Sequence, residues 1–302
     1  MNDWLSMEYD ELLNEAIMSE TPIVVVEGVD DVPVYENLCF SIDGNHEVIA
    51  IQNLKGKHEG SKSVVSFIEE INMLDFSGEL EKYIIGIIDR DARFYRNELS
   101  VMPGLFVLKW YSMESHFITQ EAVRSVLTQC TGLSRKLITN ALIDEIYHEV
   151  VSAMMPLYFV GLESLRKACE VDYLSIATYS MNIDHLKNTG AYDRVLDKKQ
   201  ELSEFALSKS INHDVNGLFE VCKGKWLLNE FSSILIKKIK ALKIRCGARE
   251  IECCQFCHVE ASSLCSYKFE SNYDTAQIRS IIKRHEGFTM FGYLKQRLDY
   301  MV

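Results

Sequence analysis

The sequence lacks any apolar run as long as a membrane span, and its first twenty residues carry six acidic and no basic side chains. The missing run argues against a membrane-spanning helix, and an acidic start is unlike a secretory signal peptide. A net charge of −12 argues against indiscriminate binding of nucleic acid, because phosphate groups require local lysine and arginine. Nine cysteines, an odd number without a secretory signal, indicate a reducing compartment. We therefore expect a cytoplasmic protein.

Two short, strongly apolar stretches end in acidic residues. Residues 23–26 precede Glu27, and residues 83–88 precede Asp89 and Asp91. β-branched runs of this length are typical of strands that are buried on both faces. Ligands of open α/β sheets bind beyond the carboxyl ends of the strands, so the three acids are expected to meet there if the strands are neighbours. Crowded carboxylates favour a hard divalent cation such as Mg²⁺, although acids also follow strands simply because loops are polar.

Strand-like and helix-like stretches alternate over the first 125 residues and then give way to helices. Besides the two acid-ending strands, we expect strands at 46–54 and 105–108, and helices at 4–18, from Asp30 or Asp31 to Cys39, at 63–74 and from about Glu114. Helical spacing of apolar residues recurs at 133–155, 163–170, 193–209 and 225–243. The stretch 274–298 again looks helical, with breaks near Gly287 and Gly292. The sequence therefore predicts an α/β protein. Residues 1–125 would form a parallel sheet with flanking helices, and residues 126–302 a mainly α-helical domain.

The two acidic strand ends together resemble the TOPRIM domain of primases, topoisomerases and overcoming-lysogenization-defect (OLD) nucleases. In that family a glutamate after the first strand and an Asp-x-Asp after a later strand surround magnesium. Glu27-Gly28 and Asp89-Arg90-Asp91 match this pattern, and the resemblance covers roughly the first 125 residues. It implies a nuclease site in which Glu27, Asp89 and Asp91 hold one or two Mg²⁺ ions.

Two further candidates follow the fourth predicted strand. Lys109 is placed to stabilise charge that develops on a phosphate, and Glu114 to bind metal or orient a water. The segment resembles a Glu-Asn-Tyr-Leu-type helix of TOPRIM-containing phage-defence effectors, although Ser115 and His116 replace the asparagine and tyrosine. Glu114 has a simpler alternative role as a first-turn acid that interacts with the helix dipole.

Two lysine-rich segments have open interpretations. The turn at residues 55–63 lies where a P-loop would be, but its glycine spacing is wrong, so nucleotide hydrolysis is not expected. Its lysines could still contact a substrate phosphate at the helix N-terminus. Residues 223–249 carry eight basic side chains against one acid, which suits either a nucleic-acid-binding face or a solvated helix face.

Five cysteines, Cys246, Cys253, Cys254, Cys257 and Cys265, lie close together in the C-terminal part of the sequence. Cys254 and Cys257 form a C-x-x-C pair, and Cys265 or Cys246 could complete a zinc site. The second C-x-x-C of a full zinc ribbon is missing, and cysteine is also a common core residue. The spacing is compatible with structural Zn²⁺ and with simple burial.

The whole chain resembles the TOPRIM nuclease effector of PARIS-type anti-phage defence systems, in which a TOPRIM half precedes a mostly helical half. This implies a toxin that an ABC-type ATPase partner holds inactive until a phage trigger protein acts on the complex. The released effector, expected to be a homodimer, would cleave host RNA, with tRNA the expected substrate, and abort the infection. Three alternatives remain: an OLD-type DNA endonuclease, a metal-free ribonuclease with a histidine acid–base pair, and a non-catalytic interaction subunit of the defence complex.

Overall fold

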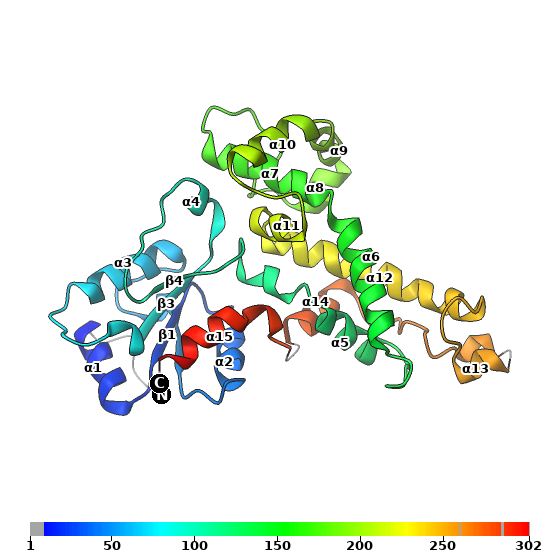
Figure 1. Ribbon diagram of the computed structural model, residues 1–302, viewed down its shortest axis with the longest axis horizontal. Coiled ribbons are helices and arrows are strands. Elements are labelled where there is room, and N and C mark those ends of the chain that lie inside the picture. The colour runs from blue at the N-terminus through cyan, green and yellow to red at the C-terminus, as the bar shows by residue number, and fades with distance from the viewer. Residues whose placement is uncertain (1–8, 260, 285–286, 302) are drawn as a thin grey trace. The chain divides into compact units, whose positions relative to one another are not determined.

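The computed structural model describes residues 9–259, 261–284 and 287–301, which form two compact units (Figure 1). One unit comprises the chain through Lys109 together with the residues from Phe288 onward, and the other runs from Trp110 to Gly287. The division therefore falls sixteen residues before the expected one at 125, and the end of the chain returns to the first unit.

The first unit is built on a four-stranded parallel sheet with the order β2-β1-β3-β4. The strands are β1 (Ile23–Val26), β2 (Glu47–Ala50), β3 (Ile84–Ile88) and β4 (Leu105–Val107). The predicted α/β class with a parallel sheet is confirmed. The second strand is shorter than the predicted 46–54, because Ile51–Asn53 turns into the 3-10 helix η2. The two central strands, β1 and β3, are the ones that end in acids.

Helices cover both faces of this sheet (Figure 1). Helices α1 (Tyr9–Ser19) and α3 (Ser61–Asn72) share one apolar core with the strands, and α2 (Val32–Phe40) and α15 (Gly292–Asp299) lie on the opposite face. Gly86 in β3 lets α3 approach closely, because a Cβ there would lie only 2.7 Å from Val64 Cγ1. Residues 4–8 of the first predicted helix fall outside the described part of the chain.

Short elements join these layers. Two of them, η3 (Leu80–Lys82) and α4 (Asp91–Tyr95), were not expected from the sequence, whereas η6 (Thr289–Phe291) lies within the predicted helical stretch 274–298. Helix α4 follows β3 directly, and its first residue is one of the predicted site acids. The local geometry of Asp91 therefore depends on how this helix starts.

The second unit is helical, as the sequence predicts for most of it. Its elements are η4 (Met113–Phe117), α5 (Gln120–Cys130), α6 (Asn140–Met154), α7 (Leu157–Cys169), α8 (Ile183–Asn188), α9 (Ala191–Leu196), α10 (Lys199–Ser208), α11 (Val215–Val221), α12 (Gly224–Gly247), α13 (Gln255–His258), η5 (Ser262–Leu264) and α14 (Thr275–Arg284). The helix predicted from about Glu114 begins as the 3-10 helix η4. The α-helix α5 starts at Gln120, because the Thr119 hydroxyl caps it by accepting a hydrogen bond from the Ala122 N–H.

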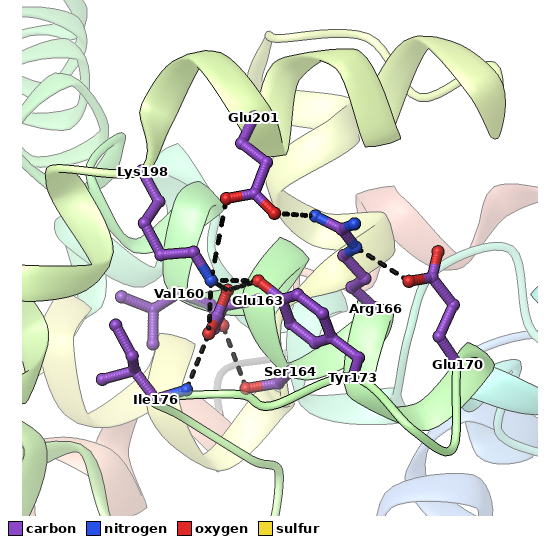
Figure 2. A network of polar contacts seen from close by, with 9 residues as sticks. All are labelled: Val160, Glu163, Ser164, Arg166, Glu170, Tyr173, Ile176, Lys198 and Glu201. Carbon is purple, nitrogen blue, oxygen red and sulfur yellow. Dashed lines mark hydrogen bonds and ion pairs between the residues drawn. The ribbon is translucent and has the colours of Figure 1, made fainter.

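A buried carboxylate organises one end of this unit (Figure 2). Glu163 on α7 is fully buried and accepts hydrogen bonds from the Tyr173 hydroxyl and the Ile176 N–H, both at 2.7 Å. It also pairs with Lys198 Nζ at 3.0 Å, and Lys198 in turn contacts Tyr173. Glu163 therefore connects α7 to the segment that follows it and to the start of α10.

Among the helices described, none combines the length and the apolar character that crossing a membrane requires.

Candidate metal and nucleic-acid site

The structure brings the ends of the two acid-ending strands together. Glu27 directly follows β1, and its Oε1 accepts a hydrogen bond of 2.7 Å from the backbone N–H of Asp89, which directly follows β3. The Glu27 carbonyl oxygen accepts a second bond, of 2.9 Å, from the N–H of Gly60. Two other segments, those of Asp89 and Gly60, thus hold the glutamate at the carboxyl edge of the central strand pair.

Asp91 takes a conformation that few non-glycine residues adopt. Its φ is +36°, in the left-handed region, which typically costs about 1–2 kcal/mol for a residue with a Cβ. The carboxylate is held by Arg93, whose backbone N–H donates at 2.6 Å and whose Nε donates at 2.9 Å. This ion pair holds the Asp91 carboxylate against Arg93 at the start of α4, and it places one positive charge among the acids.

Asp31 is a site residue that the sequence suggested only as a helix cap. It occupies the N-cap position of α2, but its side chain makes no capping bond. Instead its Oδ2 accepts a hydrogen bond of 3.2 Å from the N–H of Gly28, which places it beside Glu27. Its position on the same loop as Glu27, directly after β1, is the signal that could have identified it.

Two tyrosines also belong to this edge. Tyr35 is buried, and burial together with the nearby charges of Asp89 and Asp31 raises its pKa. Burial and the charge of Asp89 raise the pKa of Tyr293, on α15, to about 12. Its hydroxyl accepts a hydrogen bond of 3.0 Å from the Lys109 N–H. Because α15 is remote in the sequence, no local pattern could have assigned Tyr293 here.

The surroundings of Glu27 raise the pKa of its carboxyl group. Burial is the largest cause and raises the pKa of this carboxyl group to about 7, with further increases from the charges of Asp31 and Asp91. The Asp89 N–H and the Arg93 guanidinium act in the opposite direction but are weaker. The crowded acids of this edge therefore favour taking up a proton or a cation.

Glu27→Gln should stabilise the metal-free protein above pH 7. The folded chain keeps the Glu27 proton up to pH 7, whereas an unfolded chain loses it near pH 4.5, so stability falls as the pH rises between these values. Glutamine avoids that loss and can still accept the Asp89 hydrogen bond. The difference should reach at most about 3 kcal/mol. Melting curves in EDTA at pH 5 and pH 8 test this: a variant that is no more stable than wild type at pH 8 would contradict it.

Lys109 lines a cavity of about 440 Å³ together with Arg90, the residue between Asp89 and Asp91. Its side chain is exposed, and its carbonyl oxygen accepts a hydrogen bond of 2.8 Å from Arg90 Nη1. The Arg90 guanidinium carbon lies 3.7 Å from the centre of the Phe94 ring, which is 44% exposed. Arg90 and Phe94 therefore give this cavity a cationic and an aromatic side chain close to Asp89 and Asp91 in the sequence.

Glu114 belongs to the second unit and has a clear structural position there. Its Oε2 accepts a hydrogen bond of 2.8 Å from the Ser112 hydroxyl. A Cβ on Gly224, the first residue of α12, would lie 2.5 Å from the same oxygen. The acid therefore lies at the N-terminus of α12, where a helix dipole favours negative charge. Its role as a metal ligand stays a prediction.

Several basic side chains of the two lysine-rich segments make internal contacts. Lys57 Nζ, from the P-loop-like turn, binds Glu70 at 2.9 Å and Ser66 at 3.0 Å, and its side chain is only 7% exposed. On α12, Lys238 and Arg245 pair with the acids Glu149 and Glu145 of α6. These contacts favour a structural role for the charges involved.

The four cysteines come together within the second unit. The Sγ atoms of Cys246, Cys254, Cys257 and Cys265 all lie within 4.8 Å of one another, close enough to bind one metal ion. Among the described residues this is the one set of three or more possible ligands so arranged. Glu27, Asp89 and Asp91 lie at the same sheet edge, but their carboxylate oxygens do not converge as the four sulfurs do.

No known protein family matches the chain, and no curated protein shows significant similarity to it.

Proposed function

We propose that the protein is a metal-dependent nuclease that acts at the sheet edge formed by Glu27, Asp89 and Asp91. One observation carries this proposal: the Asp89 N–H donates to Glu27, which joins the acidic ends of the two central parallel strands. The crevice beyond such strand ends is where open α/β sheets bind ligands. The TOPRIM resemblance supports nuclease chemistry at this place.

The side chains at this edge suit Mg²⁺. Glu27, Asp31, Asp89 and Asp91 all offer oxygen atoms. Mg²⁺ is usually bound through one or two carboxylates while it keeps several waters. One or two ions could therefore bind without a closed protein cage, provided that Asp91 releases Arg93. Bound magnesium would supply an activated water and neutralise charge on the leaving oxygen.

The residues around the acids have separate roles in this proposal. Glu27, with a pKa of about 7, is suited to accept a proton near neutral pH, as an alternative to binding metal itself. Phe94 and Arg90 offer a stacking surface for a nucleobase, since bases stack on aromatic rings and on guanidinium groups. Lys109, at the same cavity, is placed to stabilise charge on a phosphate.

We further propose that the substrate is RNA, with tRNA first among candidates, and that the protein is the toxic effector of an anti-phage system. An ABC-type ATPase partner would hold it inactive until a phage protein triggers release, and the free effector would act as a homodimer. This part rests on the PARIS resemblance. The engagement of Lys57 with Glu70 supports it, because the chain's own P-loop-like turn is then unsuited to nucleotide hydrolysis.

A substrate assay with the purified chain tests the proposed reaction. Synthetic tRNA and supercoiled plasmid DNA are incubated together with the protein, in Mg²⁺ or in excess EDTA. Shortened tRNA, intact plasmid and no cleavage in EDTA are expected. Nicked plasmid with intact tRNA would instead identify an OLD-type DNA endonuclease. RNA cleavage that survives EDTA would contradict the metal-dependent reaction.

A further inference from the structure

The cysteine cluster joins three separate segments of the second unit. Cys246 lies in the last turn of α12, and Cys265 directly follows η5. Cys254 directly precedes α13, and Cys257 lies within it. Apart from these two short elements, the described residues from 248 to 273 form no helix. Three of the four cysteines are buried and Cys257 is partly exposed. A segment with so little regular structure needs a cross-link to hold its shape.

We propose that these four cysteines bind one Zn²⁺ ion in a structural tetrathiolate site. The Sγ atoms of Cys254 and Cys265 are 3.8 Å apart, and all four sulfurs lie within 4.8 Å of one another. Thiolates at about 2.3 Å from a tetrahedral zinc ion are separated by about 3.8 Å. The spacing fits a shared metal, and it is much longer than the bond of about 2.05 Å in a disulfide.

A backbone amide points at one of the sulfurs, as amides do around thiolate ligands. The Cys254 N–H donates to Cys246 Sγ at 3.3 Å. Core cysteines that serve only as small apolar residues have no need of such donors, whereas buried thiolates are stabilised by them.

The ligand set restricts the choice to metals that bind sulfur. Four sulfurs and no oxygen exclude Mg²⁺ and Ca²⁺, and tetrahedral sulfur sites hold zinc or iron. A site with four protein ligands has no open position for a substrate, which is the pattern of structural rather than catalytic zinc. The ion would therefore fix the segment after α12, independently of the chemistry proposed for the first unit.

The test is the metal content of the full-length protein purified under reducing conditions without chelator. Elemental analysis should find one zinc per wild-type chain. Cys257→Ser and Cys265→Ser should each lose most of it. Cys253→Ser is the matched control, because Cys253 adjoins the cluster but directs its thiol to the Cys246 carbonyl oxygen at 3.6 Å. It should keep the full amount.

Cobalt substitution of the wild-type protein keeps the test valid if the serine variants fail to fold. Co²⁺ should give the visible absorption of a tetrahedral site with an intense thiolate charge-transfer band. Absence of both zinc and this spectrum would overturn the proposal. Iron in place of zinc, or equal zinc loss in Cys253→Ser, would overturn it as well.

Discussion

Glu27→Gln is expected to lower the rate of RNA cleavage by about 1,000-fold or more, because metal-assisted charge stabilisation contributes several kcal/mol to the transition state. The substitution removes the charge that would bind the cation or accept the proton. It retains an oxygen that can accept the hydrogen bond from the Asp89 N–H. The fold should therefore survive, and at pH 8 in EDTA the variant should be more stable than the wild type.

Asp30→Asn is the matched control for this variant. Asp30 is exposed and lies on the same loop, between Glu27 and Asp31, so the change removes one negative charge from the same neighbourhood. Its cleavage rate should stay within about threefold of wild type, as expected for a solvent-screened surface charge. If both variants lose activity equally, a general electrostatic effect would explain the loss, and Glu27 would have no special role.

Glu163→Ala is expected to lower the stability of the second unit by about 3–5 kcal/mol, the usual effect of removing one partner from a buried ion pair. The alanine would leave Lys198, the Tyr173 hydroxyl and the Ile176 N–H without their common acceptor (Figure 2). Urea denaturation followed by circular dichroism measures the change. A fall in the midpoint with no change in the slope would identify a loss of stability alone.

Glu201→Ala provides the comparison within the same network. Glu201 pairs with Arg166, but its side chain is 47% exposed, so water screens the interaction. Such surface pairs contribute about 0–1 kcal/mol. Equal losses for Glu163→Ala and Glu201→Ala would show that burial of the carboxylate is not what stabilises the network.

The central strands and their acids could be predicted because the information is local. An apolar β-branched run followed by an acid appears at both β1 and β3, and parallel pairing then brings Glu27 next to Asp89. The same reasoning could not identify Tyr293, which reaches the site on the last helix. It also missed the contact between Asp91 and Arg93, because the positive φ that starts α4 has no signature in the sequence.

Errors elsewhere have similar causes. The helix expected from about Glu114 begins as the 3-10 helix η4, and Thr119 caps the α-helix that follows it. Glu114 lies against the start of α12 through a contact that is distant in sequence. For the cysteines, the C-x-x-C spacing identified Cys254 and Cys257 and left Cys246 and Cys265 as alternatives. The fold brings both of them to the cluster, which only the tertiary structure can reveal.

The most direct measurement is to induce the chain without any partner in growing bacteria and to separate the small RNAs on a gel. Wild type, Glu27→Gln and Asp30→Asn are compared at equal expression. Wild type and Asp30→Asn should stop growth and shorten tRNA, whereas Glu27→Gln should do neither. If all three behave alike, the acidic sheet edge is not the site of the reaction, and the nuclease proposal is contradicted.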